Sequence, residues 1–419
     1  MKKIVISGMI GNALEWYDYA LYAQFAYIIG IKFFPQTEFV EILTFAVFAA
    51  GFIIRPLGGI IFGHIGDKLG RRMALVIGIL LMAIPTAGIG LLPSYDTIGI
   101  AAPIILVIIR LLQGFSLGGE FSGCIAYIVE HSPAEQRGLA GSASFVSMCL
   151  GMLLGLIVAQ GFTHYLSEES LLSWGWRIPF IAGLFIGLVG LYIRNHLSES
   201  PLYKAAKEQG ALSRTPLTET ITKHWREVLM AIAVYINVTA PFYTATVFIK
   251  SYMETLGYDK NQGTTACSLI LISMSIALPI SAYFSDKIGR KPIIVWASVA
   301  LVLSTYPIFL ALHSMNFVIA LLSQIIFAVI VGVYMGPVPT LLVELFPTRV
   351  RFTGVAISYN LSAAIFGGTA PMIGAALHKA TGHQISLAYY LTGLALFGLC
   401  TLYFYRETFR NSISDNVIL

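Results

Sequence analysis

The chain has 419 residues, of which 57% are hydrophobic and only 11% carry charge. Soluble domains carry about 25% charged residues, so this composition excludes an ordinary soluble protein and predicts an integral membrane protein. The formal net charge of +5 is therefore interpreted as a topology signal, and we expect no nucleic-acid partner.

Apolar runs long enough to cross a bilayer recur along the whole chain. A hydrocarbon core of about 30 Å requires roughly 20 residues of helix. The first run follows Met1-Lys2-Lys3 and continues past Phe34 without a small-residue cleavage site, so we expect a membrane helix there and not a signal peptide. Twelve candidate spans are predicted, in chain order, at 4–34, 41–65, 73–92, 98–129, 139–164, 177–195, 227–254, 263–285, 293–312, 315–345, 353–378 and 386–406.

A polar stretch, HLSESPLYKAAKEQGALSRTPLTETITKHWR, divides these spans into two groups of six. The predicted organisation is an N-terminal six-helix bundle (1–195), a cytoplasmic central loop (196–226), a C-terminal six-helix bundle (227–406) and a cytoplasmic tail (407–419). Most lysines and arginines, Arg194 among them, then fall on the side of the two termini and the central loop. The positive-inside rule identifies that side as cytoplasmic.

The first span carries two carboxylates in the stretch GNALEWYDYALY (11–22). Glu15 and Asp18 lie three residues apart and share a helix face with Tyr19 and Tyr22. Ionisable residues at membrane depth cost at least a few kcal/mol, so each is a candidate functional group. We predict a role in proton coupling or substrate binding. The alternative for both acids is pairing with an arginine, or hydrogen bonding that holds a kinked helix. The aromatic rings of this stretch could bind a quaternary ammonium group of a substrate, or could simply line the cavity.

Two arginines also fall inside spans of the first half. Arg55, in RPLGG of the second span, is expected to snorkel toward the cytoplasmic end or to support a gate. In the fourth span, RLLQGFSLGGE (110–120) places Arg110, Gln113 and Glu120 along one stripe. We predict proton coupling for Glu120 and substrate contacts for Arg110 and Gln113. The planar guanidinium of Arg110 suits a substrate carboxylate, and the alternative is a permanent ion pair with Asp18.

Two loops of the first half recur in the second half. GHIGDKLGRR (63–72) matches AYFSDKIGRK (282–291), and EHSPAEQRGLAGSAS (130–144) matches ELFPTRVRFTGVAIS (344–358). Such a repeat predicts a pseudo-twofold axis along the membrane normal, which is typical of transporters with a site between two halves. The corresponding charged pairs are Asp67/Asp286, Arg71/Arg290, Glu130/Glu344 and Arg137/Arg351.

The second half offers polar groups but no acid deep in a span. The seventh span contains Asn237 and Tyr243 near Pro241, and the eleventh contains Tyr359 and Asn360. We predict that these four residues add substrate contacts, while the first half handles protons.

The repeated Gly-x-x-x-Asp-x-x-Gly-Arg-Arg loop resembles the signature of the major facilitator superfamily, and RLLQGFSLGGE resembles its fourth-helix motif. Six further stretches resemble its metabolite:proton symporter branch, which includes bacterial proline/betaine, citrate, α-ketoglutarate and shikimate transporters: GNALEWYDYALY, GFIIRPLGG, LPSYDTIGI, QGFSLGGEFSG, WGWRIPF and ELFPTRVR. The chain departs from the pattern at Ala282, where Gly is expected. Its end, RNSISDNVIL, does not resemble the coiled-coil tail of osmosensing members, so osmotic gating is not expected.

The resemblance implies an all-α integral membrane fold of twelve helices in two pseudo-symmetric six-helix bundles, with helices 1, 4, 7 and 10 lining the cavity. Glu15 and Glu120, at roughly 16 and 14 Å from the cytoplasmic end, would then face one space, where repulsion and desolvation favour the neutral form of one of them. The charges of the repeated loops would latch the outward-open state: Asp67, Arg71, Glu130, Arg137, Asp286, Arg290, Glu344 and Arg351. Ordinary positive-inside anchoring would explain the arginines but not the repeated aspartates.

We therefore expect a secondary transporter that imports a small carboxylate-bearing solute with a proton. The preferred substrate is a proline/betaine-type zwitterion, and the alternative substrate is a di- or tricarboxylate such as citrate or α-ketoglutarate. A uniporter or exporter of the same fold is a further alternative. The four cysteines lack metal spacing, and no nucleophile–base set stands out, so we expect no enzyme, no metal and no cofactor beyond the coupling proton. We also expect the protein to function as a monomer in a bacterial inner membrane, with both termini in the cytoplasm.

Overall fold

The computed structural model describes residues 2–35, 40–367, 369–382 and 385–409, and over these residues the regular elements are all helices. Most of the predicted tail (407–419) lies outside the described residues. Eight continuous helical segments in the described part are long and apolar enough to cross a membrane. The remaining predicted spans are helices interrupted within the membrane, together with the shorter last helix. The predicted all-helical membrane fold of twelve spans is confirmed.

The first half contains six spans. The first comprises α1 (Lys2–Gln24) and α2 (Ala26–Phe33), and the second comprises α3 (Val40–Ile53) and α4 (Arg55–Lys68), which starts with a proline in its first turn. The others are α5 (Arg71–Leu91), α7 (Ala101–Glu130), α8 (Arg137–Tyr165) and α10 (Arg177–Asn195). Short helices α6 (Tyr95–Ile98) and α9 (Glu168–Ser170) lie in the connections at one end.

The second half repeats this plan. Its first span is α13 (Trp225–Tyr243), continued through a π-helical turn into α14 (Ile249–Leu256), and α15 (Lys260–Ile288) and α16 (Arg290–Leu312) follow. The stretch GVYMGPVP, with its glycines and prolines, separates α17 (Phe317–Met335) from α18 (Val338–Leu345). The last spans are α19 (Arg351–Ser362) with α20 (Ala370–Thr381), and α21 (Ser386–Thr401). Between the halves, α11 (Pro201–Glu208) and α12 (Pro216–Lys223) give the central stretch helical structure.

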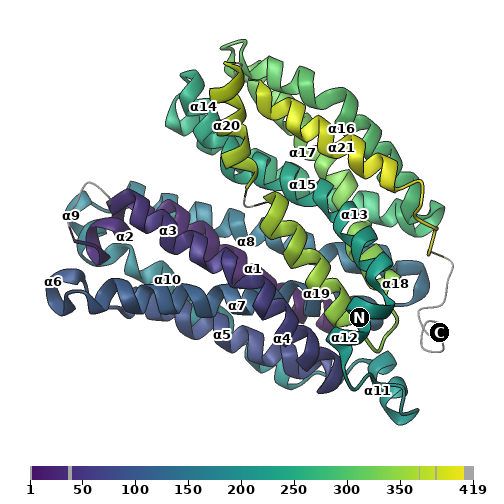
Figure 1. The fold of residues 1–419 in the computed structure, drawn as a ribbon. Coiled ribbons are helices and arrows are strands. Elements are labelled where there is room, and N and C mark those ends of the chain that lie inside the picture. Colours follow the sequence, from purple (N-terminus) through teal and green to yellow (C-terminus); the bar gives the residue numbers. More distant parts are fainter. Residues whose placement is uncertain (1, 36–39, 368, 383–384, 410–419) are drawn as a thin grey trace.

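The two halves meet at one end of the molecule and diverge at the other. In Figure 1 the first half lies below and the second above, and they converge where α4, α12, α18 and α19 lie, near the N-terminus. They separate toward α2 and α9 on one side and α14 and α20 on the other. We call the first the closed end and the second the open end.

Glycines let α7 press directly against the second span. A Cβ on Gly114 would lie 2.0 Å from the carbonyl oxygen of Gly51, and one on Gly118 would lie 2.3 Å from that of Arg55. Such approaches bring backbones together in the way that small residues do at membrane helix interfaces. They fix the position of α4, and therefore of Arg55, relative to α7.

We expect Gly114→Ala to lower the free energy of unfolding by about 1–3 kcal/mol, because the added methyl group overpacks this contact. Gly161→Ala in α8 is the matched control, since its Cβ would meet nothing within 4 Å. The control should be neutral or stabilising, because alanine favours a helix over glycine by up to about 1 kcal/mol. Unfolding temperatures of the purified variants in detergent measure the difference, and equal temperatures would contradict the close contact.

Candidate functional site

A cavity of about 500 Å³ lies between the two halves toward the open end. The first half lines it with residues of α1, α2 and α8, among them Tyr19 and Tyr22, and the second half with residues of α14, α15 and the π-helical turn, among them Phe248 and Lys250. Tyr19 also lines a second, much smaller space of about 10 Å³, deeper in the first half. The two cavities therefore adjoin at Tyr19, and charged residues line the deeper one.

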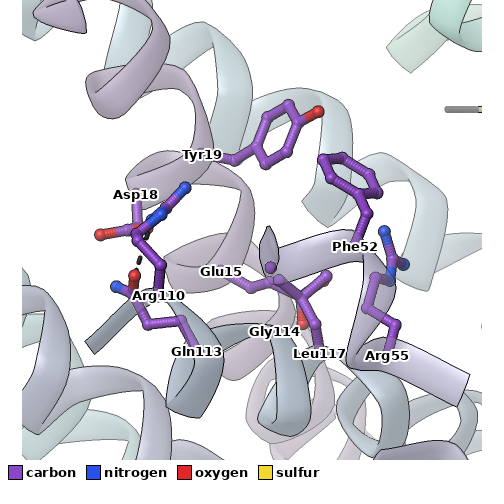
Figure 2. A pocket seen from close by; sticks show the side chains of 10 residues that line it. Glu15, Asp18, Tyr19, Phe52, Arg55, Arg110, Gln113, Gly114 and Leu117 are labelled. Carbon is purple, nitrogen blue, oxygen red and sulfur yellow. Dashed lines mark hydrogen bonds and ion pairs between the residues drawn. The ribbon is translucent and has the colours of Figure 1, made fainter. Parts of the chain in front are cut away.

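Asp18, Arg110 and Gln113 form one closed polar cluster in the deeper cavity (Figure 2). An Nη of Arg110 donates to Asp18 Oδ2 at 2.7 Å and to Gln113 Oε1 at 2.6 Å. The guanidinium also lies over the ring of Tyr22, 4.1 Å from its centroid. Both charged groups are buried. The geometry is that of the alternative in which Asp18 and Arg110 neutralise each other.

Glu120 forms a second closed pair with Arg194. Both carboxylate oxygens of Glu120 accept hydrogen bonds from the Arg194 guanidinium, and Arg194 Nη1 also donates to the carbonyl oxygen of Leu75. Cβ atoms on Gly11 and Gly78 would clash with this pair, so the glycines make room for it.

Two expectations are corrected here. Arg194 does not lie at a cytoplasmic surface: its side chain is fully buried and points back along α10 into the first half. Helical side chains lean toward the helix N-terminus, which brings a long residue near the C-terminus of α10 inside the bundle. Glu120 consequently faces Arg194 and lines neither of the two cavities, so it does not share the space around Glu15.

Glu15 and Arg55 face the same deep cavity and differ from these closed pairs. Neither carboxylate oxygen of Glu15 has a hydrogen-bond partner in the described part of the chain, although only 1% of the residue is exposed. Figure 2 shows Glu15 between the Asp18–Arg110 cluster and Arg55. Arg55 is equally buried, which corrects the expectation that it snorkels toward the cytoplasmic end.

Arg55 instead reaches across to the second half. One Nη donates to the hydroxyl of Tyr243 at 3.3 Å and the other to the hydroxyl of Tyr359. Its guanidinium also lies 5.3 Å from the centroid of the Phe52 ring. The predicted substrate residues Tyr243 and Tyr359 therefore meet a cation of the first half. Sequence reasoning missed this role, although an arginine in the middle of an apolar span was the available signal.

An aromatic cluster surrounds this point of contact. Trp16 packs edge-on against Phe242 with centroids 5.6 Å apart, and Phe52 packs against Tyr19 at 5.5 Å and Tyr243 at 6.1 Å. These rings come from both halves, and Tyr19 and Phe52 among them line the deeper cavity. Tyr19 also lines the open-end cavity, so the aromatic cluster adjoins both cavities.

The other two candidates of the second half lie elsewhere. Asn360 donates to the carbonyl oxygen of Gly118 at 2.7 Å and so joins α19 to α7 across the two halves. Asn237 lies against Gly398 of α21, inside the second half. Neither residue lines the two cavities.

The repeated loops make two equivalent contacts at the closed end. The carboxylate of Asp67 accepts the backbone N–H groups of Phe352 at 3.1 Å and Thr353 at 2.9 Å, in the first turn of α19. The carboxylate of Asp286 accepts those of Gly138 and Leu139, both at 2.8 Å, in the first turn of α8. Each aspartate thus caps a helix N-terminus of the opposite half, where unpaired N–H groups attract an anion.

Ion pairs surround both caps. Arg71 pairs with Asp67 at 2.9 Å and Arg290 with Asp286 at 2.6 Å. Glu130 pairs with Arg71 of its own half at 3.2 Å and with Arg351 of the other half at 2.8 Å, so it links the two halves. Glu344 pairs with Arg290 of its own half at 3.3 Å. Arg137 forms no ion pair with the described residues, but its carbonyl oxygen accepts a hydrogen bond from Thr340 at 2.8 Å.

Sequence reasoning missed a third repeated element at this end. Glu199 accepts the backbone N–H groups of Arg71 and Arg72 that start α5, and Glu407 accepts that of Lys291 near the start of α16. The next residue acts alike in both halves, since the Ser200 hydroxyl donates to Glu130 and the Thr408 hydroxyl donates to Glu344. A Glu-Ser or Glu-Thr pair after the last span of each half was the signal.

No cluster of three or more potential metal ligands occurs among the described residues. Two matched six-span halves around a central cavity, with buried charges in the smaller cavity that adjoins it, define a multi-pass membrane protein built as a secondary transporter.

Comparison with known proteins gives the family. Residues 38–368 match the model of the Major Facilitator Superfamily. The chain is 37% identical over 412 residues to a "Putative proline/betaine transporter" of Staphylococcus aureus (strain COL), covering 96% of this chain and 88% of that one. It is 36% identical to the "Glycine betaine/proline/ectoine/pipecolic acid transporter OusA" of Dickeya dadantii (strain 3937), covering 97% and 84%. The chain therefore belongs to the major facilitator superfamily, and it is a transporter and not an enzyme.

Solved structures share the fold at low sequence identity. The proton:xylose symporter XylE bound to 6-bromo-6-deoxy-D-glucose superposes with a TM-score of 0.81 at 20% identity, covering 97% of this chain and 96% of that one. The inward-open form of XylE from E. coli gives a TM-score of 0.66 at 19% identity, covering 98% and 97%.

Proposed function

We propose that the protein is a proton-coupled symporter of a small zwitterion of the proline/betaine type, working by alternating access as a monomer in a bacterial cytoplasmic membrane. The observation that carries the proposal is the aromatic cluster, whose rings come from both halves and adjoin the buried arginines and carboxylates of the deeper cavity. A quaternary ammonium group binds aromatic faces, and a carboxylate binds arginine. The names of the relatives from Staphylococcus aureus and Dickeya dadantii support this substrate class.

The arrangement of the halves fits the outward-facing state of such a cycle. We assign the closed end to the cytoplasm, because the lysines and arginines of the connections favour that side. The cavity then opens to the outside, where the substrate is captured.

Among the three predicted proton-coupling acids, Glu15 is the best candidate for the coupling site. Asp18 and Glu120 each have an arginine partner, whereas Glu15 has none within 4 Å in the described part of the chain. A buried carboxylate without a hydrogen-bond donor is costly in its charged form, so the neutral form fits this site. Release of that proton on the other side of the membrane would complete the coupling.

Uptake into proteoliposomes tests the proposal. The purified chain is given labelled proline, glycine betaine, citrate, α-ketoglutarate and shikimate, with and without an inward proton gradient. Accumulation of proline or betaine that requires the gradient is the expected result. Accumulation of citrate or α-ketoglutarate would favour the dicarboxylate alternative, and equilibration that ignores the gradient would show a uniporter.

We expect Tyr19→Leu to weaken glycine betaine binding roughly 5- to 30-fold, the equivalent of one lost cation–π contact of about 1–2 kcal/mol. Tyr19 is the residue that lines both cavities, so its ring meets a solute moving from one to the other. Tyr19→Phe keeps the aromatic face and should bind within a few-fold of the wild type. Calorimetric titration of both variants measures the effect, and an equal loss in both would show that the hydroxyl matters and not the ring.

A further inference from the structure

The charges in and beside the deep cavity comprise two ion pairs and two further groups, one acid and one arginine, that form no ion pair with the described residues. Three acids and three arginines of the first half are buried away from the closed end: Glu15, Asp18, Arg55 and Arg110 line this cavity, and Glu120 and Arg194 lie beside it. Asp18 neutralises Arg110, and Glu120 neutralises Arg194. Glu15 and Arg55 remain, and neither forms an ion pair with any described residue. The arginine expected to bind a substrate carboxylate, Arg110, already holds a carboxylate of the protein.

Arg55 has the surroundings of an anion receiver. Its guanidinium donates to two tyrosine hydroxyls and lies over two aromatic rings, and its Nε has no hydrogen-bond partner among the described residues. A buried guanidinium that meets no anion lacks the compensation that buried charges usually have. Arg55 also lies against Tyr243 and Tyr359 of the second half, so an anion bound here would touch both halves at once.

Glu15 is the protein group that competes for this cation. Arg55 and Glu15 line the same deep cavity, and the other charged groups near Glu15 are Glu120, Asp18 and Arg194. Those three are held in the two closed pairs, so their charges largely cancel. From the second half, the groups that interact with Glu15 are the phenols Tyr235, Tyr243 and Tyr359. The charge state of Glu15 therefore decides whether Arg55 carries an uncompensated positive charge.

We propose that Arg55 binds the carboxylate of the transported zwitterion, and that it does so only while Glu15 is protonated, because ionised Glu15 would take the same guanidinium. The inference rests on the proposed function and names the residues of its coupling. Proton and zwitterion then bind together: the proton enters on Glu15, and the carboxylate occupies the space between Arg55, Tyr243 and Tyr359. Loss of the proton draws Arg55 back to Glu15 and releases the solute.

Binding calorimetry on the purified full chain tests the assignment of Arg55. We expect Arg55→Gln to weaken glycine betaine roughly 10- to 100-fold, the equivalent of a charge-assisted hydrogen bond of about 1.5–3 kcal/mol. Arg55→Lys keeps the positive charge but loses the planar guanidinium. Its affinity for glycine betaine should fall between those of the wild type and Arg55→Gln. Arg214→Gln, the same change at an exposed arginine, should match the wild type. Size-exclusion profiles and unfolding temperatures show whether each variant is folded.

Proton uptake on binding tests the assignment of Glu15. Titrations in two mildly alkaline buffers of different ionisation enthalpy report the protons taken up with glycine betaine. We expect the wild type to take up protons and to bind more weakly as the pH rises. Glu15→Gln should bind betaine without proton uptake and with an affinity that does not change with pH. Wild-type proton uptake in Glu15→Gln would overturn the coupling.

Two other outcomes separate this inference from the proposed function. If Arg55→Gln binds betaine as the wild type does while Arg110→Gln loses it, the carboxylate binds at Arg110, and the inference fails although the symporter stands. If the wild type binds citrate or α-ketoglutarate but no zwitterion, the proposed substrate class fails, and the same variants titrated with that solute decide the role of Arg55. If no carboxylate of the panel binds, both are overturned.

Discussion

Arg194→Met is expected to lower the free energy of unfolding by about 3–5 kcal/mol, the range for breaking a buried ion pair from one side. The change leaves the carboxylate of Glu120 buried without its ion-pair partner, and it also removes the donor to the carbonyl oxygen of Leu75. Methionine fills similar volume, so the loss reports charge and hydrogen bonding more than packing. Denaturant unfolding of the purified variant in detergent measures the effect.

The double variant Glu120→Gln/Arg194→Met is the control for this prediction. It removes both charges, so most of the lost stability should return, because neutral replacements of a buried pair are often tolerated. Arg214→Met, at an exposed position, should leave the unfolding curve unchanged. If the single and double variants lose the same stability, removing the charge of Glu120 has not restored any of the loss. The charge state of Glu120 would then not depend on Arg194.

The second large effect is expected for Asp67→Ala. This change should shift the protein toward the alternate state, in which the two halves separate at the end where they meet in this structure. The change removes two charge-assisted hydrogen bonds to α19 of the opposite half and one to Arg71. At about 1.5–3 kcal/mol for each bond to a charged group, the loss of the two inter-half bonds shifts the equilibrium by roughly 100-fold or more. The first half keeps its own packing, so the variant should remain folded.

Spin labels across the closed end measure this shift. Leu69 and Ile288 are exposed and lie just after Asp67 and Asp286, one in each half. With cysteines there, in a chain without its four native cysteines, the distance distribution should lengthen in Asp67→Ala. Asp286→Ala should lengthen it to a similar extent, and Glu208→Gln, an exposed acid of α11, should not. Unchanged distances in both aspartate variants would refute the role of these caps in closure.

The sequence predicted the parts of this molecule that depend on position along the chain. Apolar length located the spans, and repetition of the loops located the charges at the closed end, because equivalent loops of two similar halves occupy equivalent places. The direction of a single long side chain was beyond such reasoning. Arg194 turns into its bundle and Arg55 crosses to the other half, and each direction depends on helix packing, such as the glycine contacts of α7, that no pattern within one span records.

The same limit explains the candidates of the second half. Tyr359 and Asn360 are neighbours on one helix, and the structure directs the first to Arg55 and the second to the backbone of α7. Asn237 lies within the predicted span but faces α21. Residue type correctly indicated a polar group in each case, while the partner depended on the rotation of α13 and α19 within the bundle.

The two aspartate caps have a further consequence. Asp67 holds the start of α19 as Asp286 holds the start of α8, so the closed end is a self-complementary surface in the sense of an isologous interface in a symmetric homodimer. Two copies of one six-span unit would close on each other through these contacts without any covalent connection. Duplication of such a unit supplies a gate whose two sides already match. Positions away from the closed end can then diverge, as they have here, where the three acids buried outside the closed end, Glu15, Asp18 and Glu120, all belong to the first half among the described residues.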